Sequence, residues 1–163
     1  QLYHADDWDV IGYARELVAL TQAPLDVVRA EQEQELAQNK DFLEKSALRQ
    51  LEARHKRQLS AATMASLHQL MAIARSWLRD VLVICAQGDE LIVNTDVASA
   101  LNAVALDTNE ARAASALAVT SAIDRALTYN VSPETCIDVL LFAIRDILYG
   151  QTETQDYARL LQH

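Results

Sequence analysis

Apolar residues between positions 67 and 85 repeat at the spacing of one broad helical face. They recur three or four residues apart, with two adjacent pairs: Leu67, Leu70, Met71, Ala74, Leu78, Val81, Leu82 and Cys85. Such spacing is typical of an amphipathic helix packed against a core. Trp77 widens the face, whereas Arg75 and Arg79 point elsewhere. The pattern predicts the central helix of a bundle over residues 60–87, capped by Ser60 and ended by Gly88.

The region before this helix is less regular. A first helix is predicted to begin near Ala5 or Asp6 and to break or restart at Pro24. The pattern weakens over residues 25–39, which predicts an exposed or partly ordered helix. Helical spacing returns over residues 42–51. The predicted first helix has its apolar face at Ile11, Ala14, Leu17, Val18 and Thr21.

Three further helices are predicted downstream. Residues 91–93 form a short β-branched run, but one strand would have no partner, so an ordered loop is predicted. Asn94 or Thr95 caps the next helix, and residues 107–110 form a turn and a cap. Ser132 and Pro133 suit the cap and first position of the last helix, which ends at Gly150. The alanine-rich helix between them has its inner face at Ala113, Ala116, Leu117, Thr120, Ile123 and Leu127.

Composition supports an all-α fold. The chain has 163 residues, of which 51% are hydrophobic, and only 3 Gly and 2 Pro for turns. We therefore predict one compact helical bundle of five to six helices. Residues 1–44 are predicted to form an N-terminal helix with a linking helical segment, and residues 45–163 the main bundle.

Charge and cysteine content bear on where the protein works. A net charge of −9 does not attract nucleic acid to the molecule as a whole. Cys85 and Cys136 lie on apolar faces, which predicts free thiols and a reducing, cytoplasmic setting. Neither a membrane span nor a signal peptide is predicted. Because the chain begins with Gln1, we expect it to be processed or excised from a longer protein.

A cluster of positive charge interrupts this acidic chain. Five cations stand against Glu52 within residues 45–57, which gives this basic island a net charge of +4. It is interpreted as a solvated helix surface or, alternatively, as a contact for an acidic partner or for nucleic acid. The second interpretation would give strongly salt-dependent binding. The cations are Lys45, Arg49, Arg54, Lys56 and Arg57.

Motifs for chemistry are scarce. The chain has no phosphate-binding glycine loop, no Cys-x-x-Cys and no His-Glu-x-x-His. Glu52 and His55 match one half of the Glu-x-x-His pattern of di-iron bundles, but such a site needs two pairs and further glutamates. Neighbouring Arg54, Lys56 and Arg57 would repel a cation. A solvated helix face is therefore preferred, and no catalytic residue, metal or cofactor is predicted.

Four segments in a fixed order carry a family resemblance. They are Leu51–Arg57, the helix end Trp77–Val83, Val93–Asp96, and Tyr129–Pro133 before a final apolar helix. Their order and separation resemble the C-terminal collar domain of bacterial DNA polymerase III clamp-loader subunits, of the actinobacterial delta-prime type. The resemblance covers about residues 45–149. Its motif residues in this sequence are Arg79, Asp80, Asn94, Asp96, Asn130 and Pro133.

The resemblance implies an assembly function. Collars of this family pack in a ring that holds the loader together, while a separate AAA+ module handles ATP and the complete polymerase is a nucleotidyltransferase. This chain would then be non-catalytic and bind gamma/tau and delta subunits, with DNA contacted only indirectly or weakly. The outer faces of the helices at 60–87 and 133–149 are expected to contribute. A gamma/tau collar and a metal-binding bundle enzyme are the alternatives.

Overall fold

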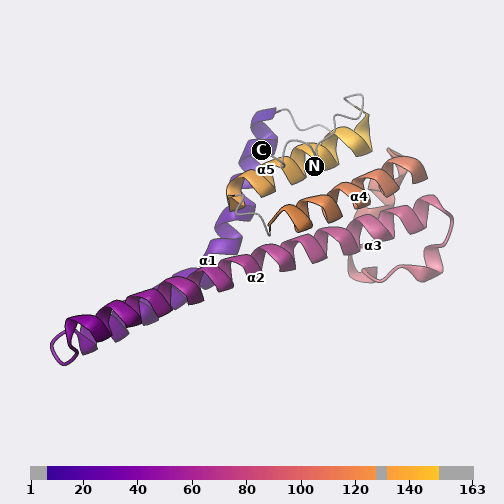
Figure 1. The fold of residues 1–163 in the computed structure, drawn as a ribbon. Helices are drawn as coiled ribbons and strands as arrows, with labels where there is room; N and C mark the ends of the chain where they lie inside the picture. The colour runs from indigo at the N-terminus through magenta and orange to yellow at the C-terminus, as the bar shows by residue number, and fades with distance from the viewer. Residues whose placement is uncertain (1–6, 128–131, 151–163) are drawn as a thin grey trace.

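The computed structural model describes residues 7–127 and 132–150, and within these ranges it contains helices and no strand. The all-α prediction is confirmed, with five α-helices (Figure 1). Two short 3-10 helices, η2 (Asp89–Leu91) and η3 (Thr95–Val97), lie in the connection after the second helix. The α-helices are α1 (Asp7–Asn39), α2 (Lys45–Cys85), α3 (Ala98–Leu106), α4 (Glu110–Ala126) and α5 (Pro133–Tyr149).

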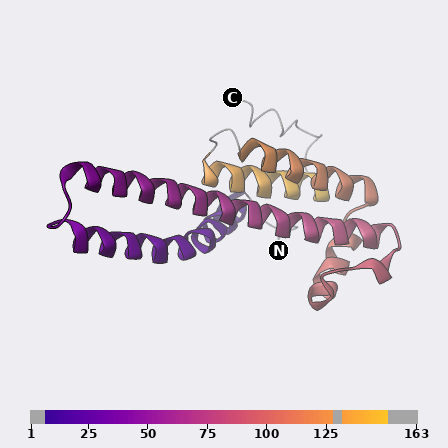
Figure 2. The same ribbon diagram turned by 60° about the horizontal axis from the view of Figure 1, so that its bottom comes forward.

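The first two helices form an antiparallel hairpin that reaches well beyond the rest of the fold (Figures 1 and 2). The C-terminal half of α2 packs with α3 and α4, and the N-terminal part of α1 lies against α5. We call the projecting part, residues 28–58, the arm. The boundary predicted at residue 44 falls at the turn of this hairpin. However, α1 packs against both α2 and α5 and is therefore part of the bundle.

The core forms where four helices meet. α1, α2, α4 and α5 all contribute to it, and the predicted inner faces of the last three are buried or partly buried. Ala113 and Ala116 are fully buried, and such small side chains let α4 approach α2 closely. Both cysteines are free, as predicted. The main cluster contains Val10, Ala14, Leu67, Met71, Ile123, Leu127, Cys136, Ile137 and Leu140.

The prediction that Pro24 interrupts the first helix is wrong. Pro24 lies inside α1, which continues to Asn39 and includes the segment whose pattern was weak. A proline within a helix removes one backbone hydrogen bond and bends the helix without necessarily ending it. Figure 2 shows α1 changing direction between its bundle half and its arm half. Leu25, next to Pro24, is buried, and this packing supports the helix across the proline.

The predicted start of the central helix is also wrong. Ser60 is an interior residue of α2, which begins at Lys45 and so includes most of residues 42–51, where helical spacing was predicted to return. A serine favours a cap only where the chain has reason to break. Here Leu51 and His55 are buried and stabilise the helix upstream of Ser60.

The end of α2 uses a different residue from the one predicted. Gln87, with φ 59°, takes the left-handed conformation, and Gly88 does not. The amides of Gln87 and Gly88 donate to the carbonyls of Ile84 and Val83, both at 2.9 Å. This is the hydrogen-bond pattern of a Schellman motif, in which the left-handed residue is usually glycine. Gly88, the next residue, is closely packed, because a Cβ added there would lie 3.3 Å from Cγ1 of Val83.

The ends of α5 match the prediction. The Ser132 side chain accepts a hydrogen bond from the amide of Thr135 at 3.1 Å, and Pro133 occupies the first turn. Gly150 ends the helix with φ 69°. The predicted cap at 107–110 is also present, because Asn109 accepts a bond from the amide of Arg112 at 3.0 Å. These caps were predictable because they depend on residues close in sequence.

Candidate functional site

An apolar groove runs between α1, α2 and α5. It has a volume of about 510 Å³, and Glu16 is the only charged residue among the described residues that line it. Leu20, Ile73 and Trp77 are 69%, 52% and 39% exposed along it. Its lining comprises Tyr13, Glu16, Leu17, Leu20, Leu70, Ile73, Ala74, Trp77, Leu78, Val81, Val104, Leu140, Leu141, Ile144, Leu148 and Tyr149.

The groove exists because the apolar face of α2 is wider than the surface its neighbours cover. Leu78 and Val81 are buried, while Ile73 and Trp77, one turn apart, remain open to solvent. α1 diverges from α2 where it bends toward α5 (Figure 2), so its Leu17 and Leu20 line the groove without closing it. An apolar hollow of this kind on a water-facing surface is typical of a binding site.

A second feature joins three of the family-motif residues. The fully buried carboxylate of Asp80 accepts bonds from the Asn94 amide and the Asn94 side chain, both at 2.7 Å. The Val93 amide donates to it at 3.1 Å and Arg79 at 2.7 Å. Arg79 also donates to the Leu91 carbonyl at 2.6 Å, and Asn94 to Ser76 at 2.9 Å. The carboxylate thereby fixes the connection after α2 against that helix.

The electrostatics of Asp80 follow from these bonds. Burial alone raises the pKa of its carboxyl, but donation by the Asn94 backbone, by Arg79, by the Asn94 side chain and by the Val93 backbone outweighs burial. The pKa is lowered to about 2. A carboxylate so fully bonded is a structural anchor and is poorly suited to accept a substrate proton. Asn94 therefore serves this network, and neither Asn94 nor Thr95 caps α3, whose N-cap position is Val97, contrary to the prediction.

The other motif residues are dispersed. Asp96 is exposed on η3, and its side chain forms no hydrogen bond with any described residue. Pro133 begins α5. Asn130 lies outside the described residues. The structure thus joins Arg79, Asp80 and Asn94 by hydrogen bonds, and neither Asp96 nor Pro133 takes part in this network.

The Glu52–His55 pair does not assemble as a site. Glu52 is exposed, whereas His55 is buried toward α1, where its Nε2 lies 2.7 Å from Glu35 Oε2. Arg54 donates to the other oxygen of Glu35 at 2.6 Å. The bonds from His55 and Arg54 lower the pKa of Glu35. In the described part of the chain, no three His, Cys, Asp or Glu side chains gather as metal ligands would.

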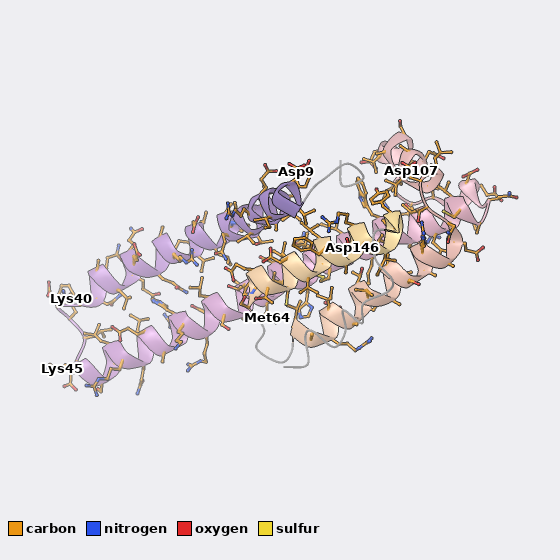
Figure 3. All side chains as sticks on the ribbon, turned by 90° about the horizontal axis from the view of Figure 1, so that it is seen from above. Asp9, Lys40, Lys45, Met64, Asp107 and Asp146 are labelled. Atoms are coloured by element: carbon orange, nitrogen blue, oxygen red, sulfur yellow. The ribbon has the colours of Figure 1, made fainter. Side chains whose placement is uncertain are left out.

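The basic island lies on the arm half of α2. Arg54 is paired with Glu35 across the hairpin. Lys45, Arg49, Lys56 and Arg57 are exposed, and none of them forms an ion pair within the residues that the structure describes. Figure 3 labels Lys40 and Lys45 on the two sides of the turn that ends the arm.

Charged contacts between helices escaped the sequence analysis. Asp124 of α4 accepts from Arg75 of α2 and lies 2.7 Å from the ring of His68, which is therefore not isolated. Burial raises the pKa of Asp124, but the bonds from Arg75 and His68 outweigh it and lower the pKa.

The sequence contains a partial signal that Glu35 faces the neighbouring helix. Gln32 and Glu35 continue the stripe of Leu25 and Val28 at helical spacing, with polar residues replacing apolar ones.

Comparison with known proteins assigns this chain to no family. No family model matches this chain, and no curated protein or solved structure matches it significantly. None of the described helices has the length and hydrophobicity that crossing a lipid bilayer requires. The inference of function therefore depends on the geometry above and on the sequence resemblance.

Proposed function

We propose that this chain is an assembly module that binds a helical segment of another protein in the groove between α1, α2 and α5. The observation that carries the proposal is the exposure of Leu20, Ile73 and Trp77 along one apolar groove. Large apolar side chains at the centre of a patch are the usual anchors of protein interfaces. The occupant we propose is an amphipathic helix, because the groove is lined by helices and contains one charge, Glu16.

The particular assembly we propose is the collar of a cytoplasmic clamp loader of the delta-prime type, with gamma/tau and delta subunits as partners. The resemblance of the four segments supports it. So does the position of the groove between α1, α2 and α5, because α2 and α5 are the two helices that were expected to contribute to partner contacts.

The alternatives are supported less well. A gamma/tau collar would differ by self-association, and a stable homotrimer or homotetramer in sedimentation would favour it. A metal-binding enzyme on Glu52 and His55 has little geometric support, because one is exposed and the other is paired with Glu35. Stoichiometric iron or manganese in the purified protein would favour this alternative.

The groove can be tested with one charge. Ile73→Glu places a carboxylate at its exposed centre, where a docked helix would have to desolvate it. We expect association with gamma/tau and delta subunits to weaken at least about tenfold, which corresponds to roughly 1.4 kcal/mol. The measurement is sedimentation of mixtures of the purified proteins.

A matched control separates docking from general surface effects. Leu106→Glu adds the same charge at a side chain that is 87% exposed and outside the groove. It should leave association unchanged, and circular dichroism should show both variants folded. If Ile73→Glu assembles as well as the parent chain, the groove is not the docking surface. If gamma/tau and delta subunits bind neither the parent chain nor the Leu106→Glu variant, the collar proposal fails.

A further inference from the structure

Four cations of α2 occupy the solvent side of the arm. Leu51 and His55 are buried toward α1, and Lys45, Arg49, Lys56 and Arg57 are exposed around the rest of the helix. Arg49 and Lys56 are seven residues apart and so lie on the same side of a helix with 3.6 residues per turn. From Lys45 to Lys56 the helix rises about 16 Å at 1.5 Å per residue. We call these four cations the basic face.

The basic face is positive because its four cations outnumber the carboxylates beside them. Five other arginines each pair with an acidic residue: Arg29, Arg54, Arg75, Arg79 and Arg145. The four cations of the basic face make no such pair within the described residues, and Glu52 is the single carboxylate among them. On α1, the helix that faces α2 across the arm, Glu35 forms its contacts with Arg54 and His55. The arm therefore has positive charge on its outer side.

We infer that the basic face of the arm binds the phosphate backbone of double-stranded nucleic acid. Lys and Arg spread along a straight helix can neutralise several phosphates at once. The arm projects beyond the bundle (Figures 1 and 3), so this face lies apart from the carboxylates of the bundle. The inference is independent of the collar proposal, since it uses none of the residues that line the groove.

The composition of the face favours nucleic acid over an acidic protein. The exposed residues between the cations are small or polar, such as Ser46, Gln50 and Ala53. A protein interface would need apolar anchors there, whereas phosphate contacts need none. Phe42 is 87% exposed but belongs to the turn before α2. An aromatic ring at the turn is suited to stacking on unpaired bases, so its removal distinguishes duplex from single-strand binding.

The test compares two variants of equal charge. Arg49→Gln with Lys56→Gln neutralises two cations of the basic face, and Arg15→Gln with Arg29→Gln neutralises two exposed cations of α1. Binding of a fluorescent 20-base-pair DNA duplex is measured by anisotropy between about 50 and 200 mM salt. We expect the first variant to lose about tenfold or more in affinity at low salt. The slope of log K against log salt is negative, and its magnitude should decrease by about 2, because each lost phosphate contact removes roughly 0.9.

Further arms make the outcome decisive. Glu52→Gln should tighten duplex binding, because it removes the carboxylate among the cations, and Phe42→Ala should leave it unchanged. The inference is overturned if the duplex does not bind at 50 mM salt or if both double variants lose equally. It is also overturned if a polyglutamate peptide binds more tightly than DNA, which would indicate an acidic protein partner. A strong loss with Phe42→Ala would contradict duplex binding in favour of single strands.

Discussion

Asp80 shows how a single buried charge can organise a loop. Its carboxylate has no exposure, yet donors from Arg79, Val93 and Asn94 surround it. A buried ion is costly unless such bonds replace its hydration. Here the donors come from the helix itself and from the connection after it, so the ion and the loop stabilise one another.

Replacing this charge tests the network. Asp80→Asn keeps the shape but loses charge-assisted bonds, so the free energy of unfolding at pH 7 should fall by about 2 kcal/mol or more. The pKa of Asp80 is lowered from 3.8 to about 2 by folding. The stability it confers is therefore complete above pH about 4 and is lost as the pH falls toward 2. Urea denaturation between pH 5 and pH 2 measures both effects.

The pH dependence identifies the residue responsible. Asp80→Asn should lose less stability than the parent chain over that interval, because it lacks the group that becomes protonated. Asp96→Asn, at an exposed position on η3, should behave like the parent. If Asp80→Asn and the parent show the same loss between pH 5 and pH 2, another carboxyl is responsible.

At the scale of the element, two helix ends solve the same problem with different residues. α2 ends with Gln87 in the left-handed region and α5 ends with Gly150 in the same region. A residue with a Cβ is disfavoured there, whereas glycine is not. The end of α2 is therefore suboptimal, and the end of α5 is not.

Exchanging the residue types should have opposite effects. Gln87→Gly should raise the free energy of unfolding by about 0.5–1 kcal/mol, and Gly150→Ala should lower it by about 1 kcal/mol. The guanidinium of Arg112 lies where the added methyl group would be, but it ends a flexible, exposed side chain that can move aside, so the loss comes from the backbone conformation. Thermal or urea unfolding measures both. Ala86→Gly, at φ −86°, is the control and should not stabilise. A gain there equal to that of Gln87→Gly would contradict the backbone explanation.

At the scale of the whole molecule, the fold combines a well-packed bundle with a thin arm. The bundle buries residues from α1, α2, α4 and α5, whereas Leu51 and His55 are the buried residues of α2 within the arm. Local stability follows the density of buried contacts. The two halves of α2 should therefore differ although they form one continuous helix.

Hydrogen exchange should reveal this difference. Amides of residues 46–58 should exchange at least about tenfold faster than those of residues 67–82, which corresponds to an opening free energy roughly 1.4 kcal/mol lower. Mass spectrometry after proteolysis resolves both halves within one sample, so each molecule contains its own control. Equal protection along α2 would show that the arm opens only with the bundle.

Much of the fold could be predicted because its determinants are local. The stripe from Leu67 to Cys85 and the caps at Ser132 and Gly150 depend on residues within a few turns of one another. Pro24 and Ser60 misled the prediction because both carry a local signal for a boundary. Packing at Leu25, Leu51 and His55 overrides that signal.

The sequence by itself determined that the chain is helical, which faces are apolar, and that positive charge gathers in residues 45–57. Only the tertiary structure decided that Glu35 meets His55, that Asp80 holds Asn94, and that Trp77 lines an open groove. The physical reason is distance along the chain. Periodicity and capping act between neighbours in sequence, whereas pairing and exposure depend on which distant helices cover one another.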